Sequence, residues 1–308
     1  MSLKVCAAGG DNAIRSVSAR SEAGGGVDGL RRGGSDGENG IMSLKVCVIG
    51  SGSSGNSIFV RSDEVKILID LGLSVARVEK SLAVLGETSD GVSVLLTHCH
   101  SDHVAGADKF VRRHPDAKLY CADWCYRTIS GKIGAAYASL TPEAGDFYIG
   151  DVTVSPFRVD HDVPCAGFGI YSGGRKITVA TDLGVFTDGI LEKAADSDVM
   201  VIECNHDERL LRQNPNYSYR LKERILSEHG HLSNAACGEA IAELAHRGVK
   251  QFVLAHLSRE NNYPELAFET VREVLGERGI SEDKASIEVA TQDGMSSLFV
   301  IGKGGVNG

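Results

Sequence analysis

The chain has 308 residues, of which 42% are hydrophobic and 24% charged, and its formal net charge is −9. This composition is that of a globular protein with a sizeable core, and no apolar run approaches the ~20 residues that a membrane-spanning helix needs. The acidic balance argues against a cationic nucleic-acid-binding surface over the whole chain, but a local basic patch is compatible with it. Eight cysteines without disulfide-scaffold spacing and an N-terminus without a secretory signal predict reduced thiols and a cytoplasmic location.

The first 41 residues differ in composition from the rest of the chain. Residues 24–40 hold eight glycines and few large apolar side chains. Such a segment cannot bury enough apolar surface to fold, so we expect residues 1–41 to be a disordered, Gly-rich N-terminal extension. The opening residues MSLKVC recur at 42–47, where they continue into a credible strand. We therefore predict that the folded domain spans residues 42–308.

A glycine-rich loop follows the first predicted strand, at 44–49. Residues 50–55 formally match the dinucleotide-binding pattern G-x-G-x-x-G. That pattern requires a helix after the third glycine, whereas residues 57–60, SIFV, predict a second strand, so we reject the dinucleotide interpretation. Two interpretations remain, namely a hairpin turn or a loop whose backbone N–H groups face a substrate phosphate.

Strand and helix patterns alternate to the C-terminus. A strand at 65–69 ends in Asp70 and one at 176–181 ends in Asp182, and each aspartate opens the tripeptide Asp-Leu-Gly. A carboxylate that ends an apolar strand is expected to have a partner, because an unpaired buried charge is costly. Further predicted strands cover 92–96, 118–121, 151–159, 166–172, 198–203, 250–255, 285–289 and 296–301. Predicted helices cover 74–85, 103–113, 122–131, 186–195, 217–228, 233–247 and 264–277. This order predicts an α/β domain with mixed sheets between helices.

The densest cluster of metal-binding residue types follows the strand at 92–96. His98, His100, Asp102 and His103 lie within six residues of a chain that has only ten histidines. Zinc and similar ions take imidazole and carboxylate ligands, and catalytic sites keep one position open for water. In an extended loop His98 and His100 point to the same side and can hold one ion, while Asp102 and His103 can reach a second. The loop therefore predicts half of a two-metal hydrolytic site.

The motif THCHSDH at residues 97–103 resembles the signature of the metallo-β-lactamase fold superfamily. The resemblance implies a four-layer αββα sandwich that carries two divalent metal ions, zinc or manganese, along one edge of its sheets. It also implies further ligands downstream, each after a predicted strand. The implied set is His98, His100 and His161 for one ion, Asp102, His103 and His256 for the other, and Asp182 between them. Asp70 matches the aspartate that supports the ligands from behind.

Four further segments carry a narrower resemblance. GSGSSGN at 50–56, ECNHD at 203–207, GHLSN at 230–234 and HLSRENN at 256–262 are similar to the YycJ (WalJ) family of bacterial hydrolases, over residues 42–302. That family is associated with metal-dependent 5′→3′ exonuclease activity on DNA, including a role in mismatch repair. The resemblance implies a nucleic-acid substrate, with DNA favoured over RNA, and mismatch-repair proteins as candidate partners.

The order of Glu203 and His231 is similar to that in ribonuclease Z, where a glutamate after a strand partners a histidine near the metals. Carried over, Glu203 orients His231, which protonates the leaving oxygen as a general acid. Asp102 helps to hold a metal-bridged hydroxide, which the lowered pKa of metal-bound water makes available for in-line attack on a phosphodiester. The alternative is that Glu203 caps a helix and His231 is structural.

Basic and aromatic residues lie between Glu203 and His231. Residues 209–224 hold five basic side chains against one acid, a local charge of +4, together with Tyr217 and Tyr219. Such a segment is typical of surfaces that bind phosphates and splayed bases, although a solvated helix face has the same composition. Three other functions stay open: a ribonuclease of the same fold, a small-molecule ester or lactone hydrolase, and a binding module without activity.

Overall fold

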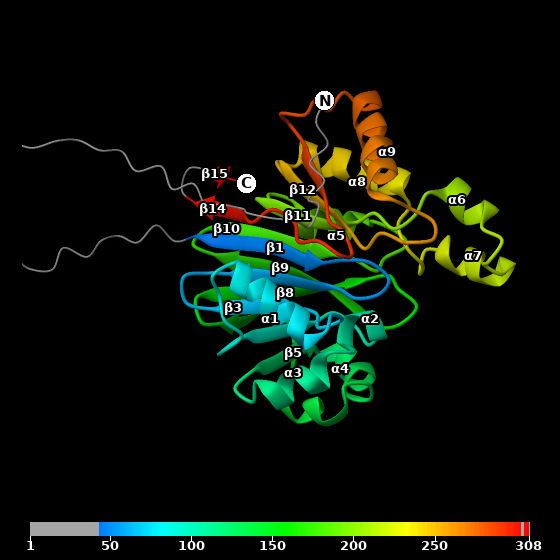
Figure 1. Cartoon of the computed structure of the whole chain (residues 1–308). Helices are drawn as coiled ribbons and strands as arrows, with labels where there is room; N and C mark the ends of the chain where they lie inside the picture. Colours follow the sequence, from blue (N-terminus) through cyan, green and yellow to red (C-terminus); the bar gives the residue numbers. More distant parts are fainter. Residues whose placement is uncertain (1–42, 303–304, 308) are drawn as a thin grey trace, which may run out of the picture.

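Two β-sheets pack face to face between outer helices in the computed structural model (Figure 1). The structure describes residues 43–302 and 305–307, so the predicted extension at 1–41 and the predicted domain start at 42 lie outside the described residues. None of the helices in these described ranges is both long and apolar enough to cross a membrane.

The first sheet has the strand order β15-β14-β1-β2-β3-β4-β5-β6. Its strands are β1 Leu44–Gly50, β2 Ser57–Arg61, β3 Lys66–Ile69, β4 Ser93–Leu96, β5 Lys118–Ala122, β6 Leu140–Glu143, β14 Phe299–Gly302 and β15 Gly305–Asn307. The strands from β3 to β6 run parallel, and the others pair antiparallel. The helices between the parallel strands are α1 Val75–Val84, α2 Ser101–Val104, α3 Ala107–Arg113, α4 Asp123–Ser130 and the 3-10 turn η1 Gly134–Ser139.

The second sheet has the order β13-β12-β11-β10-β9-β8-β7. Its strands are β7 Phe147–Ile149, β8 Val152–Val159, β9 Cys165–Ser172, β10 Arg175–Ala180, β11 Val199–Glu203, β12 Gln251–Ala255 and β13 Ser286–Val289. The strands from β10 to β13 run parallel. Its helices are α5 Asp188–Ala194, α8 Asn234–His246 and α9 Pro264–Glu277, while α6 Glu208–Gln213 and α7 Tyr219–Ile225 project to the right of the layered body in Figure 1.

The side chains of β11 pack into two different hydrophobic cores, one on each face of the strand. Val199 and Val201 belong to the cluster that contains residues of both sheets, whereas Met200 and Ile202 pack with residues of α5, α8 and α9. Successive side chains of a strand point to opposite faces, so an uninterrupted apolar run is needed where both faces are covered. The predicted αββα sandwich is therefore confirmed.

The predicted helix at 103–113 is instead two helices, α2 and α3, with a break before Gly106. The Gly106 N–H donates to the Leu71 carbonyl at 2.7 Å, and a Cβ at this position would lie 2.5 Å from the Leu73 carbonyl oxygen. This close approach holds the loop that carries His98, His100, Asp102 and His103, called the metal loop below, against the segment after β3. The strands β6 and β7 and the helix α6 were not predicted, because segments of three to six residues are too short to show a clear periodicity.

Candidate metal centre

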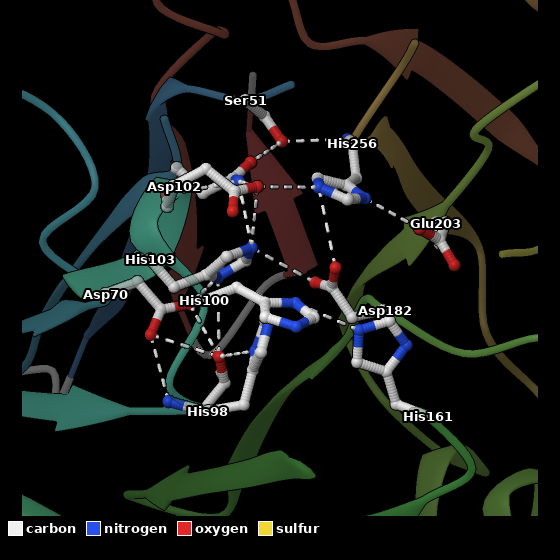
Figure 2. Close-up of polar contacts among 12 residues, drawn as sticks. Ser51, Asp70, His98, His100, Asp102, His103, His161, Asp182, Glu203 and His256 are labelled. Carbon is white, nitrogen blue, oxygen red and sulfur yellow. Dashed lines mark hydrogen bonds and ion pairs between the residues drawn. The ribbon is translucent and has the colours of Figure 1, made fainter. Parts of the chain in front are cut away.

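The candidate ligands converge at the carboxyl ends of strands from both sheets. Ligands of open α/β sheets bind outside these ends, because the loops that follow neighbouring strands meet there. The residues follow β3 (Asp70), β4 (His98 and His100), β8 (His161), β10 (Asp182) and β12 (His256), with Asp102 and His103 in α2. Figure 2 shows their side chains pointing toward one another.

Three histidines form the first ligand group. His98, His100 and His161 each offer a ring nitrogen within 4.8 Å of the other two. His161 Nε2 lies 3.3 Å from His100 Nδ1. His98 Nε2 is buried and meets no hydrogen-bond partner among the described residues. A buried nitrogen without a partner is costly, so this group fits a metal ion that takes up its lone pair.

Asp102, His103 and His256 form the second ligand group, also within 4.8 Å of one another. Asp102 Oδ2 lies 3.4 Å from Nε2 of each histidine. Asp182 lies between the two groups, 3.3 Å from His103 Nε2 and 3.5 Å from His256 Nε2, and it clusters with His98 as well. Five imidazoles and two carboxylates are thus brought together, a donor set that suits divalent transition metals. The structure places all seven predicted ligands at one site.

Asp70 fixes the orientation of two of the histidines. Its Oδ2 accepts a hydrogen bond from His103 Nδ1 at 2.7 Å, and its Oδ1 accepts from the Thr97 backbone N–H at 2.9 Å. The Thr97 hydroxyl donates to Asp70 and lies 3.0 Å from His98 Nδ1. With Nδ1 bound to an oxygen acceptor, the Nε2 lone pair of each ring is left for a metal.

The supports of His100 and His161 were not predicted from the sequence. His161 Nδ1 lies 3.3 Å from the Gly230 carbonyl oxygen. His100 Nε2 lies 3.4 Å from Asp162 Oδ1, and the other Asp162 oxygen accepts a hydrogen bond from Arg224 of α7. In the sequence, only the position of Asp162 directly after His161 could have indicated that Asp162 supports a candidate ligand.

Buried charges at the centre balance one another. Burial lowers the pKa of His98 far below its usual value, with a further contribution from His103, and keeps the ring neutral. Burial also opposes protonation of His256, but Asp182, Asp102 and Glu203 outweigh it and raise the pKa of His256 to about 10. Burial would raise the pKa of Asp182, yet the surrounding histidines hold it far below its usual value. Divalent cations would replace these protons as the partners of the carboxylates.

Three of these residues adopt left-handed backbone conformations that non-glycine residues seldom take. Asp70, Asp182 and His256 have φ values of 65°, 59° and 58°. Such conformations cost roughly 1–3 kcal/mol each and persist where the surroundings fix them. The His256 N–H, for example, donates to Ser51 Oγ at 2.8 Å. All three conformations occur at the first or second residue after a strand, namely after β3, β10 and β12.

The glycine-rich loop at 50–56 is a hairpin turn between β1 and β2, which confirms the first of its two interpretations. The second interpretation does not hold for the N–H groups of residues 51, 52, 54, 55 and 56, which donate to acceptors within the chain, and it stays a prediction for that of Ser53. Instead the loop braces the centre through Asn56, whose Nδ2 lies 3.3 Å from Asp102 Oδ2 and 3.0 Å from His103 Nε2.

Glu203 is fully buried and joins His231 to the second ligand group. Its Oε1 accepts hydrogen bonds from His231 Nδ1 at 2.9 Å and from His256 Nδ1 at 2.7 Å. The sequence predicted the contact with His231 but not the contact with His256. Burial would raise the pKa of Glu203, but the two histidines outweigh it and hold that pKa at about 2. The carboxylate is therefore ionised and orients both rings.

A pocket of about 180 Å³ opens next to the first ligand group. His161 and His231 line it together with Tyr217 and with Leu221, Arg224 and Ile225 of α7. The ring centres of His161 and His231 are 5.2 Å apart. The basic segment at 209–224 thus borders the same pocket as a candidate ligand and the candidate acid.

Comparison with known proteins gives the family. The model of the beta-lactamase superfamily domain matches residues 66–257. Exodeoxyribonuclease WalJ of Streptococcus pneumoniae serotype 2 (strain D39 / NCTC 7466) is 32% identical over 237 residues, 75% of this chain and 87% of that protein. Exodeoxyribonuclease YycJ of Bacillus anthracis is 34% identical over 249 residues, 79% of this chain and 94% of that protein.

Solved structures agree on the fold. The metallo-β-lactamase fold protein YhfI of Bacillus subtilis superposes with a TM-score of 0.62 at 17% identity, over 82% of this chain and 99% of that chain. The match to the family model covers the candidate ligands from His98 to His256. The chain belongs to the beta-lactamase superfamily and is a metal-dependent hydrolase with the metallo-β-lactamase fold.

Proposed function

We propose that the chain is a binuclear metal-dependent phosphodiesterase, and that it acts as a 5′→3′ DNA exonuclease in DNA repair. The names of the two relatives, each similar over three quarters of this chain or more, support a nuclease. The observation that carries the proposal is the pocket that His161 and His231 share with Arg224 and Tyr217 of the basic segment at 209–224. Positive charge next to a metal-ligand cluster suits a polyanionic substrate better than a neutral ester.

In this proposal all seven side chains hold metal. The proposed ligands are His98, His100 and His161 for one divalent ion, Asp102, His103 and His256 for the other, and Asp182 for both. Bound zinc or manganese ions supply a water of lowered pKa and positive charge against the phosphate oxygens. The Asp102 side chain is 20% exposed, so its carboxylate can also accept a hydrogen bond from the attacking water.

His231 is the proposed general acid. Because its Nδ1 is held by Glu203, Nε2 is the nitrogen that can meet a substrate. The side chain is 21% exposed and lines the pocket, so a leaving oxygen there lies within reach of the Nε2 proton. Positioned proton transfer of this kind contributes about 10²–10⁴-fold to a rate.

A ribonuclease of the same fold is the second candidate, because the Glu203–His231 pair protonates a leaving oxygen equally well in DNA and RNA. The test is cleavage of end-labelled, 5′-phosphorylated DNA and of structured RNA by protein loaded with manganese or zinc. The proposal predicts stepwise loss of nucleotides from the 5′ end of DNA and slower cleavage of RNA. Rapid turnover of esters or lactones without phosphodiester cleavage would refute it.

A further inference from the structure

We propose that the pocket-facing side of α7 is a subsite for the unpaired terminal nucleobase of the substrate, with Tyr217 as its stacking platform. The inference rests on the proposed nuclease function and adds to it a binding position and a substrate form. Three sets of observations support it: the surface that α7 presents, the size and composition of the pocket, and the position of the pocket beside His231.

The helix α7 leaves apolar surface facing the pocket. Every residue of α7 is at least partly exposed, although the helix carries Leu221 and Ile225 one turn apart. Both residues line the pocket, together with Tyr217 just before the helix. Residues at i and i+4 lie on one face of a helix, so Leu221 and Ile225 belong to the same face of α7. Half-buried apolar side chains beside a functional site are suited to a flat apolar ligand.

The size of the pocket suits a single nucleobase. Its volume of about 180 Å³ lies below the roughly 300–1,000 Å³ of pockets that enclose drug-sized ligands. One nucleobase is a ligand of this smaller size, and a base pair is too large. Ser53, Asn205 and Ser258 line the pocket as well and offer polar groups to the edge of a base.

Charge at the rim suits the phosphate that accompanies the base. Arg224 lines the pocket and is held by Asp162, the residue that also contacts His100. The segment at 209–224 carries a local charge of +4. Sequence-independent binding of single strands combines a basic groove with aromatic side chains on which bases stack. A nucleic-acid end with one unpaired base therefore matches this pocket better than an intact duplex does.

The proposal predicts different effects for the replacement of the two tyrosines in the basic segment. Tyr217 lines the pocket, whereas Tyr219 is 78% exposed and lies among the exposed residues at the start of α7. Both belong to the basic segment and both are aromatic, so a general electrostatic or aromatic effect would involve them equally. Replacement of Tyr219 is accordingly the matched control for replacement of Tyr217.

The experiment compares Tyr217→Ala, Tyr217→Phe and Tyr219→Ala with the wild type, all loaded with manganese. The substrates are 5′-phosphorylated single-stranded DNAs with a normal terminal nucleotide, an abasic terminal nucleotide, or an abasic second nucleotide. We expect the wild type to cleave the abasic end with a kcat/KM about 5- to 150-fold lower, which corresponds to the loss of one stacked base. The kcat/KM of Tyr217→Ala should be lower than that of the wild type by the same factor on normal DNA, and equal to that of the wild type on DNA with the abasic end.

The controls separate the subsite from the proposed function. Tyr217→Phe keeps the ring and Tyr219→Ala leaves the pocket lining intact, so both should keep the wild-type ratio of kcat/KM between the normal and the abasic end, whatever their overall rate. Equal cleavage of normal and abasic ends by the wild type, unchanged discrimination in Tyr217→Ala, or a stronger effect at the second nucleotide would overturn the subsite while the nuclease function stands. Failure of the wild type to cleave any of these DNAs would refute the proposed function itself.

Discussion

Replacing Glu203 with Gln should weaken metal binding although Glu203 is not a proposed ligand. The carboxylate accepts four hydrogen bonds, from His256 and His231 through Oε1 and from the N–H groups of Leu183 and Leu232 through Oε2. The amide oxygen of Gln can keep the two backbone donors, which leaves its NH₂ group facing two ring nitrogens. His256 can accept this N–H only in the tautomer that carries its proton on Nε2, the nitrogen that faces the metal site. We expect metal affinity to fall about 10- to 100-fold.

The same substitution should lower stability in the metal-free state. It removes two hydrogen bonds to a charged acceptor, at roughly 1.5–3 kcal/mol each, so the free energy of unfolding should drop by about 3 kcal/mol or more. For a domain of this size that corresponds to a decrease in Tm of about 6–12 °C. Thermal unfolding in chelator and calorimetric titration with manganese measure the two effects separately.

His231→Ala is the control for this experiment, because it leaves the hydrogen bond between Glu203 and His256 in place. Metal content should stay near that of the wild type, while turnover falls about 10²–10⁴-fold. Wild-type metal affinity and Tm in Glu203→Gln would show that Glu203 does not support the ligand. Loss of metal in His231→Ala would show that His231 itself is a ligand and not the acid.

Three further predictions concern protons and packing. Since the pKa of His256 is raised to about 10, the metal-free ring is protonated at neutral pH. Metal binding should therefore release protons, and metal affinity should increase as the pH rises. Calorimetry in two buffers of different ionisation enthalpy measures the release. The pKa of Glu203 is lowered from 4.5 to about 2. Its carboxylate therefore contributes about 3 kcal/mol to the free energy of unfolding above pH 4.5, and this contribution should be lost as the pH falls towards 2. Glu203→Gln should flatten this part of the curve of stability against pH. A Cβ at Gly72 would lie 1.6 Å from the Asp102 carbonyl oxygen, so Gly72→Ala should displace the metal loop and reduce metal content. Gly276→Ala in α9, where the added Cβ meets no described atom within 4 Å beyond its chain neighbours and the backbone of its own helix, should bind metal normally.

The proposed ligands were predictable because the residue types that bind metal are local in the sequence. His98, His100, Asp102 and His103 lie within six residues, and the remaining ligands end or follow apolar strands whose carboxyl ends meet at one edge. The resemblance to a known fold supplied the grouping of the ligands, which spacing alone leaves open. The structure brings all of them together, and the αββα architecture is as predicted.

Apart from Asp70, which the resemblance supplied, the supports of the proposed ligands could not be predicted, because they depend on contacts between distant segments. Glu203 meets His256 across 53 residues, and Arg224 meets Asp162 across 62. No periodicity or spacing marks such pairs. The division of the predicted helix at 103–113 has the same origin, since Gly106 is fixed by a carbonyl group of the segment after β3.

An anomalous difference map from crystals grown with manganese tests the proposed two-ion centre most directly. The proposed ligand set predicts two peaks, with Asp182 in contact with both. One peak should lie among His98, His100 and His161, and the other among Asp102, His103 and His256. A single peak, or an ion bound between Glu203 and His231, would contradict it.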